Sequence, residues 1–153
     1  CDWVSGARMI VRRQVFEDIG LLDEGYFLYF EEVDFCRRAK KAGWECWYVP
    51  ESRVIHLEGG TTGIRNAAKR RPAYWYDSRR RYFVKHHGVG GLILADLLLS
   101  LGRISYLLRR FLRLGAQGEN CDPNGFMFDL LWGDLRALCN GKVSRISRMK
   151  VRA

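Results

Sequence analysis

The sequence predicts an α/β fold with short strands and two helices in its N-terminal part and further helices in the remainder. Short apolar runs bounded by turn residues are typical of strands, and three such runs occur, at Ala7–Val11, Trp44–Val49 and Arg53–His56. Longer segments with helical periodicity and with glycine or proline at their ends predict helices. These segments are Arg13–Ile19, Glu31–Ala42, Pro72–His87, Leu92–Leu114 and Phe126–Leu138. The polar, basic tail Lys142–Ala153 is expected to be frayed.

Net charge divides the 153-residue chain into three segments. Residues 1–64 carry 8 basic and 11 acidic side chains, residues 65–113 carry 12 and 2, and residues 114–153 carry 6 and 4. The overall charge of +9 therefore comes mainly from the middle segment, which favours a docking surface there. The five cysteines form no C-x-x-C pair, which argues against a disulfide scaffold and against a zinc site.

Three carboxylates, those of Glu31, Glu32 and Asp34, stand where an aromatic loop becomes a helix. Tyr26, Phe27, Tyr29 and Phe30 supply the aromatic side chains of this loop. Acids in a first helical turn are stabilised in their charged form by the helix dipole. An ionised carboxylate beside poorly hydrated aromatic surface suits a general base for a hydroxyl nucleophile. Ordinary helix capping is the competing interpretation.

The sequence motifs around these acids resemble those of a known family. They follow one another at close spacing as Asp2–Ala7, Met9–Arg13, Val15–Glu17, Ile19–Glu24, Tyr29–Asp34, Ala42–Trp44 and Val49–His56. In this order they resemble the acceptor-side half of the family 2 inverting glycosyltransferases, a group that includes bacterial rhamnosyltransferases and galactofuranosyltransferases. The resemblance is strong from residue 1 to about residue 66 and looser as far as Gly88.

This resemblance implies the C-terminal half of a GT-A fold, the α/β fold of nucleotide-diphospho-sugar transferases, with appended C-terminal α-helices. It divides the chain into an acceptor and metal side at residues 1–66, basic and amphipathic helices at residues 67–114, and a C-terminal helix with a basic tail at residues 115–153. Family members carry a nucleotide-binding half upstream, with an Asp-x-Asp motif that this chain lacks. The chain alone is therefore expected to be inactive.

The resemblance also implies roles for the acids. Glu32 aligns with the second acid of the family pair and is the expected general base, although the family usually has aspartate there. Glu31 is its neighbour in the pair. Asp34 is expected to cap the helix or to orient a neighbouring arginine, and Arg37 is expected to pair with the donor diphosphate or with the acids.

Further site residues follow from the resemblance. His56 is expected to complete the coordination of a Mg²⁺ or Mn²⁺ ion whose other ligands belong to the missing half; without the family, a structural histidine is the simpler interpretation. Trp3, Ser5 and Gly6 are expected to lie beneath the donor sugar and acceptor. The alternative for Trp3 is that it is an ordinary core residue. The loop of Gly59, Gly60 and Thr61 is expected to close over substrate.

The middle segment raises the possibility of a membrane contact. Val89–Leu101 is a nearly continuous apolar run of 13 residues, shorter than the roughly 20 residues that span a bilayer. Beyond it arginines alternate with apolar side chains, as in an interfacial helix, and Arg79–Arg81, Lys85 and two histidines precede it. The sequence therefore predicts a cytoplasmic protein held peripherally on the anionic inner face of the plasma membrane. A helix packed on the catalytic domain is the alternative.

Together these observations predict part of an enzyme that moves a sugar, with rhamnose as the first choice, from a nucleotide-diphosphate donor to a cell-envelope or lipid-linked glycan acceptor with inversion. The alternative is a non-catalytic basic module that binds a membrane or nucleic acid, because aromatic residues such as Tyr74, Trp75 and Tyr82 are interleaved with basic ones. The sequence contains no zinc-finger, recognition-helix or RNP pattern, so a nucleic-acid partner is not expected.

Overall fold

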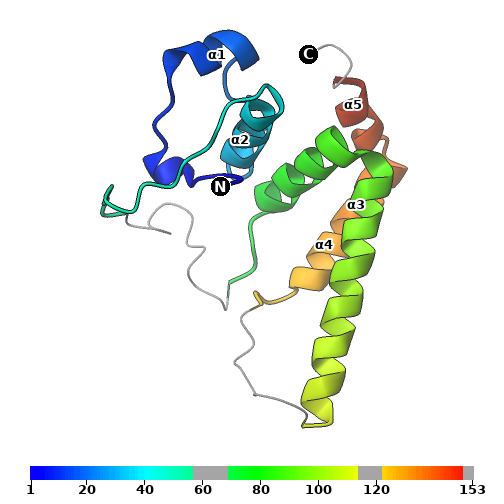
Figure 1. Ribbon diagram of the computed structural model, residues 1–153. Helices are drawn as coiled ribbons and strands as arrows, with labels where there is room; N and C mark the ends of the chain where they lie inside the picture. Colours follow the sequence, from blue (N-terminus) through cyan, green and yellow to red (C-terminus); the bar gives the residue numbers. More distant parts are fainter. Residues whose placement is uncertain (57–68, 114–121, 150–153) are drawn as a thin grey trace.

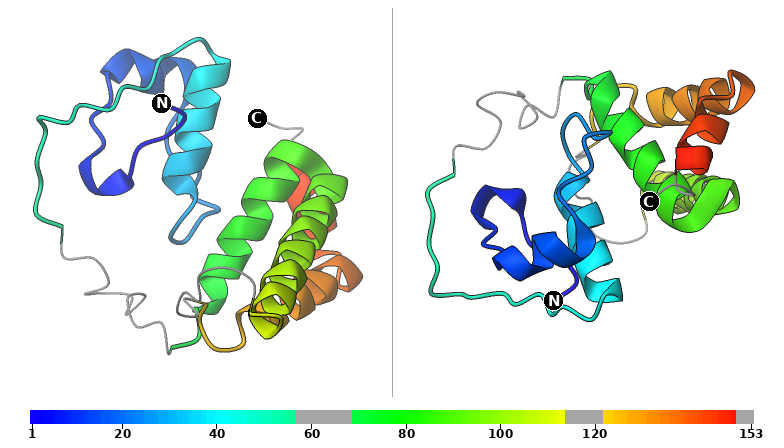
Figure 2. Two further views of the ribbon diagram at one scale, coloured as in Figure 1. Left: turned by 60° about the horizontal axis from the view of Figure 1, so that its bottom comes forward. Right: turned by 90° about the horizontal axis from the view of Figure 1, so that it is seen from above.

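The computed structural model describes residues 1–56, 69–113 and 122–149 (Figure 1). Within them the chain forms one short 3-10 helix and five α-helices. These are η1 (Gly6–Arg8), α1 (Arg13–Ile19), α2 (Glu31–Lys41), α3 (Ala73–Phe111), α4 (Phe126–Cys139) and α5 (Lys142–Met149). The N-terminal part lies on one side of the first portion of α3, and α4 and α5 lie on the other (Figure 2).

Helices α1 and α2 pack together through a small apolar core. The rings of Phe16 and Phe35 are 5.1 Å apart, and Val15, Phe35 and Cys36 are buried. Helix α1 ends at Gly20, whose positive φ of 76° lets its N–H close the last turn onto the Phe16 carbonyl. Glycine is the residue that adopts this backbone without steric cost, so the end of α1 follows directly from the sequence.

The structure does not form the three predicted strands. Residues 6–8 are the 3-10 helix η1, and the rest of the three segments has no regular secondary structure. A strand requires a neighbouring strand to receive its backbone hydrogen bonds, and no described segment pairs with these three. Their apolar side chains are correspondingly open to solvent, with Ile10 96% and Ile55 93% exposed. The regular secondary structure of the described residues is thus entirely helical, and it does not confirm the predicted α/β class.

Helix α3 consists of two arms that meet at Gly88. The backbone of Gly88 is not helical (φ 73°, ψ −176°), and the chain reverses direction there, so that residues 73–87 form a first arm and residues 89–111 a second arm (Figure 1). Pro72 stands at the N-cap of the first arm, where its missing N–H is not needed. The predicted break between two helices at Gly88 is confirmed.

A bundle core joins both arms of α3 to α4 and α5. Its buried members are Val84, Leu92, Ala137, Val143 and Ile146. Helix α5 lies in the segment predicted to be a frayed tail, and this prediction was wrong. Val143 and Ile146 stand three positions apart, so they share one helical face that can be buried. The mostly polar composition of the segment made this two-residue apolar pattern easy to overlook.

Buried charges also hold the bundle together. Arg79 contacts Asp96 of the second arm at 2.7 Å and Asp134 of α4 at 3.1 Å, and Arg80 contacts Asp134 at 2.6 Å. All four side chains are nearly buried, and two positive charges balance two negative ones. A buried charge without its partner is strongly destabilising, so this cluster fixes the two arms and α4 in one arrangement.

Candidate active site

The loop before α2 is held in an unusual conformation. Tyr29 and Phe30 both have φ of 70°, in the left-handed region, which bulky residues rarely adopt. The Phe30 ring packs 5.8 Å from both Trp75 and Tyr82, and Tyr29 stacks 6.2 Å from Tyr74. Such strain persists where surrounding contacts impose the conformation, often at functional sites. The aromatic packing therefore fixes the start of α2, with Glu31 and Glu32, against the first arm of α3.

Glu32 lies in an environment that favours its uncharged form. It is half-buried, and one carboxylate oxygen of Glu31 and one of Glu32 are each buried with no hydrogen-bond partner among the described residues. Burial, and secondarily the charge of Glu31, raise the pKa of Glu32 above its ordinary value. A poorly solvated carboxylate binds a proton more readily, which is the property required of a general base.

The N-terminal motif predicted for the site, which comprises Trp3, Ser5 and Gly6, lies next to Glu32. A Cβ built on Gly6 would stand 3.7 Å from the Cβ of Glu32, so the backbone of Gly6 passes close to that side chain. The Ser5 hydroxyl accepts a hydrogen bond from the N–H of Ala7 at the start of η1. Trp3 is 51% exposed and lines a cavity with Val4 and Ser5. Its ring is therefore open to a ligand and is not buried in a core.

Asp34, two residues after Glu32, has the opposite environment. Its side chain is completely buried, and its carboxylate contacts four polar groups. These are His86 Nε2 at 2.7 Å, Lys85 Nζ at 2.7 Å, Arg38 Nε at 2.9 Å and the Tyr26 hydroxyl at 3.3 Å. Burial alone opposes the ionisation of Asp34, but the hydrogen bonds from His86, Lys85 and Arg38 outweigh it and hold its pKa far below the ordinary value. Asp34 is therefore a positioning residue that fixes α2 on α3.

Basic residues of the first arm face the acidic N-terminal part. Asp23 contacts Arg81 and Lys85, both at 2.8 Å, and the Ser78 hydroxyl donates to the Leu28 carbonyl at 2.9 Å. Burial opposes the ionisation of Asp23, yet the hydrogen bonds from Arg81 and Lys85 lower its pKa. Arg81 and Lys85 therefore have partners inside the protein, and the expectation that this basic run attracts lipid stays a prediction.

Sequence reasoning missed this contact, although the sequence carried a signal for it. The N-terminal segment has an excess of acids and the following segment a large excess of bases. Segments of opposite charge can bind each other as well as external partners. The i and i+4 spacing of Arg81 and Lys85 places both on one helical face, where they meet Asp23.

Arg37 is engaged with the first arm of α3. Its Nη1 lies 3.1 Å from the Tyr82 hydroxyl and 3.0 Å from His87 Nε2. The guanidinium also stands 5.8 Å from the centre of the Tyr82 ring. Within the described residues Arg37 therefore contacts α3 and makes no ion pair with Glu31 or Glu32.

Comparison with known proteins decides the family. Residues 1–78, just over half of the chain, match the family described as "Glycosyltransferase like family 2". The chain belongs to this family. The match includes the aromatic loop, the acids of α2 and the start of α3, which together form the arrangement described above.

Three relatives make the family 2 assignment more specific. The chain is 46% identical over 61 residues to the N-acetylglucosaminyl-diphospho-decaprenol L-rhamnosyltransferase of Mycobacterium tuberculosis, covering 40% of this chain and 20% of the relative. It is 42% identical over 55 residues to rhamnosyltransferase WbbL of Escherichia coli, covering 36% and 21%. It is 45% identical over 40 residues to the low-salt glycan biosynthesis hexosyltransferase Agl10 of Haloferax volcanii, covering 26% and 13%.

The chain is thus rhamnosyltransferase-like over part of its length. The matches span about a fifth of the length of the two rhamnosyltransferases. No solved structure matches the chain, so the geometry of its site is described from its own residues.

The predicted metal ligand lies apart from any complete site. His56 is exposed at the end of the first described range, and no group of three potential ligands from His, Cys, Asp or Glu occurs among the residues that the structure describes. Imidazole is an acceptable ligand for Mn²⁺, but one ligand does not hold an ion. The predicted closing loop of Gly59, Gly60 and Thr61 lies outside the described residues.

Proposed function

We propose that this family 2 chain forms the acceptor side of an enzyme that transfers a sugar from a nucleotide-diphosphate donor to a glycan or lipid-linked acceptor. The observation that carries the proposal is the pair of contrasting carboxylates in α2, with Glu32 poorly solvated and Asp34 fully paired. Rhamnose is the first donor sugar to test, because two relatives are named as rhamnosyltransferases.

In the proposed reaction Glu32 accepts the proton of the acceptor hydroxyl. The acceptor oxygen forms a bond to the anomeric carbon of the donor sugar as the bond from that carbon to the diphosphate oxygen breaks. The nucleoside diphosphate leaves with the electron pair of that bond. Attack from the face opposite the leaving group inverts the anomeric centre. Positioned proton transfer of this kind contributes on the order of 10²–10⁴ in rate.

We propose His56 as one ligand of the divalent ion that family 2 enzymes commonly use. When bound, Mg²⁺ or Mn²⁺ supplies a Lewis acid for the departing diphosphate. The described residues do not complete a site for this ion, so the proposed roles of Glu32 and Asp34 do not depend on it.

Helices α3 and α4 carry the surface that supports a membrane location. Apolar side chains with 41–83% exposure cover the second arm and one face of α4, among them Leu97, Leu98, Leu101, Ile104, Phe111, Phe128, Leu131, Trp132 and Leu135. Such a large exposed apolar surface is typical of interaction sites. Exposed Arg109, Arg110 and Arg113 stand at its end, where they would attract an anionic surface.

The second arm extends beyond the apolar run of 13 residues that the sequence shows. It remains helical to Phe111, and α3 contains an 18-residue window of mean hydropathy 1.6 that is only 11% buried, so by length and composition it is able to cross a membrane. Length and composition therefore do not decide between an interfacial and a spanning arm. We still propose that the arm lies in the plane of the inner leaflet, because crossing would draw the Arg79–Asp96 pair into hydrocarbon at high cost.

Product analysis with the full-length enzyme tests the proposed function. A panel of nucleotide-diphosphate sugars that includes a rhamnose donor is incubated with lipid-linked glycan acceptors and a divalent metal. We expect transfer of a sugar to the acceptor, with the anomeric configuration inverted. Absence of transfer with every donor and acceptor, from a correctly folded enzyme, contradicts the proposal.

A further inference from the structure

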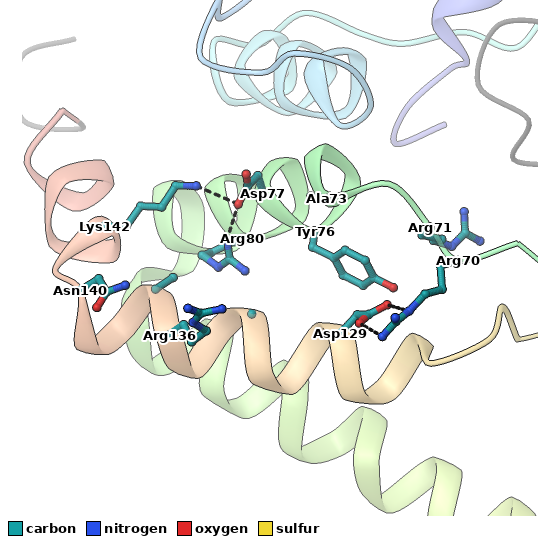
Figure 3. Close-up of a pocket in the computed structure, with 12 residues that line it drawn as sticks. Arg70, Arg71, Ala73, Tyr76, Asp77, Arg80, Asp129, Arg136, Asn140 and Lys142 are labelled. Carbon is teal, nitrogen blue, oxygen red and sulfur yellow. Dashed lines mark hydrogen bonds and ion pairs between the residues drawn. The ribbon is translucent and has the colours of Figure 1, made fainter.

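A cleft of about 500 Å³ lies between the first arm of α3 and α4, away from Glu32 (Figure 3). Its lining is strongly basic, with five cationic side chains: Arg70, Arg71, Arg80, Arg136 and Lys142. Two carboxylates, those of Asp77 and Asp129, also line it. The excess of positive charge makes the cleft a candidate site for an anion.

The carboxylates do not neutralise this lining. Arg70 makes a two-point contact with Asp129 at 2.7 and 3.0 Å. Asp77 is shared by Arg80 at 2.5 Å and Lys142 at 2.9 Å. Arg136 is exposed and has no ion-pair partner among the described residues. Arg136 is therefore the cation in the cleft that is most available to a ligand.

Two buried donors in the cleft lack acceptors. The Tyr76 side chain is 6% exposed, and its hydroxyl has no hydrogen-bond partner within the described part of the chain. Figure 3 shows this hydroxyl directed into the cleft toward Arg70 and Asp129. Arg71 Nε is likewise buried without a partner, while its guanidinium lies 4.8 Å from the Trp75 ring. Buried donors are normally satisfied, so these two indicate a missing acceptor.

Phosphate is the anion that best fits these donors. Tyr76 lies in α3, Arg136 in α4 and Arg71 just before α3, and a phosphate group has several acceptor oxygens pointing in different directions. Arginine is well suited to phosphate because its planar N–H groups bond two oxygens at once.

The position of Arg136 indicates where the phosphate comes from. Arg136 lies four residues after Trp132, so the two are neighbours on the surface of α4, and Trp132 belongs to the exposed apolar face with Phe128, Leu131 and Leu135. The cleft thus opens beside apolar surface. A lipid with a phosphate head group would place its charge in the cleft and its hydrocarbon against that face.

We propose that the cleft between the first arm of α3 and α4 binds the phosphate-bearing head group of an anionic lipid, with Tyr76 and Arg71 at one end of the cleft and Arg136 at the other (Figure 3). This proposal goes beyond sugar transfer and is tested without a sugar donor, so its outcome is independent of transferase activity.

Vesicle binding by the 153-residue chain tests the proposal. Vesicles that contain phosphatidic acid are compared with phosphatidylserine vesicles of equal surface charge, and inorganic pyrophosphate serves as the soluble probe. We expect tighter binding to phosphatidic acid, competition by pyrophosphate, and a loss of about tenfold in affinity for Tyr76→Phe and for Arg136→Gln. Arg12→Gln removes the same charge from an exposed site on the N-terminal part and should change binding less than about twofold.

Thermal unfolding separates loss of the ligand from loss of the fold. Because the Tyr76 hydroxyl has no described partner, Tyr76→Phe should keep or raise the melting temperature. If both cleft variants lose pyrophosphate binding but keep wild-type vesicle binding, the lipid assignment is overturned in favour of a soluble phosphate compound. Equal binding by the wild type and both cleft variants overturns the site itself.

Discussion

At the residue scale, environment separates two carboxylates that stand two positions apart. Glu32 has a buried oxygen with no described partner and a raised pKa, whereas Asp34 is surrounded by three basic groups and a phenol. Titratable groups whose surroundings push their pKa values apart are typical of acid and base assignments in enzymes. The sequence identified both as candidates but not their difference, because two of the four partners of Asp34, namely Lys85 and His86, lie about fifty residues away.

Replacing Asp34 by Asn should strongly destabilise the protein. The substitution leaves Arg38 and His86 without a carboxylate partner and leaves Lys85 with Asp23 alone, and breaking a buried pair in this way typically costs about 3–5 kcal/mol. Urea unfolding measures the change. Asp2→Asn is the control, because Asp2 pairs with Lys40 on the exposed surface and surface pairs contribute little. Equal stability of the two variants would contradict the role assigned to Asp34.

The contribution of Asp34 should also depend on pH. Its pKa in the folded protein is below the ordinary value of 3.8, so the folded state favours the carboxylate. The stabilisation is fully present above the unfolded pKa and is lost as the pH falls toward the folded pKa. Unfolding curves of wild type and Asp34→Asn should therefore converge as the pH is lowered below about 4. A gap that does not change with pH would refute this assignment.

The raised pKa of Glu32 has a kinetic consequence for the full-length enzyme. A general base acts only when ionised, so kcat/KM should fall on the acid side through a pKa above the ordinary 4.5. The charge of Glu31 contributes to that elevation, so Glu31→Gln should move the acid limb to lower pH. A pH–rate profile with its acid limb unchanged in Glu31→Gln would argue against the coupling.

At the element scale, local signals predicted the helices better than the strands. Pro72, Gly20 and Gly88 act on their own backbone, so each boundary was readable from a few residues. A strand depends on a neighbouring strand elsewhere in the chain, and the described residues form none beside residues 44–49. Helix α5 was missed because only Val143 and Ile146 carry its apolar face.

The turn between the two arms of α3 should depend on glycine at position 88. Its φ of 73° and ψ of −176° fall in a region that is essentially restricted to glycine, and other residues pay about 1–3 kcal/mol there. A Cβ at Gly88 meets nothing within 4 Å, so Gly88→Ala tests the backbone alone. Thermal unfolding should show destabilisation.

Gly102→Ala is the matched control for this change. Gly102 lies within the second arm and also has open space around a built Cβ, but alanine is favoured over glycine in a helix by about 0.8–1 kcal/mol. This variant should be as stable as wild type or more so. Destabilisation of both variants to the same degree would contradict the turn assigned to Gly88.

At the scale of the whole molecule, complementary charge joins its two parts. The basic side chains Arg81 and Lys85 meet Asp23 and Asp34 across the contact between the N-terminal part and α3. The sequence showed the division of charge but not whether the basic segment meets lipid or protein. The rings of Tyr82 and Trp75 also pack on Phe30 at this contact.

The remaining exposed arginines at the end of the second arm should hold the protein on anionic vesicles. Each basic residue near the surface contributes about 1 kcal/mol, and salt screens it. Replacing Arg109, Arg110 and Arg113 together by Gln should release much of the protein at moderate salt in a flotation assay. Replacing Arg12, Lys41 and Arg53 by Gln is the control of equal charge. Retention of wild type after both high-salt and carbonate washing would indicate a spanning helix instead, and absence of vesicle binding would indicate packing on protein.

The most direct test of the account is the turnover of two full-length variants, Glu32→Gln and Glu31→Gln, in the sugar-transfer assay. The amide keeps the shape of Glu32 but cannot accept the proton, so Glu32→Gln should lower kcat by about 10²–10⁴ and leave donor binding largely intact. Glu31→Gln should retain most of its turnover near neutral pH. Near-normal turnover of Glu32→Gln, with Glu31→Gln as the impaired variant, would contradict Glu32 as the general base.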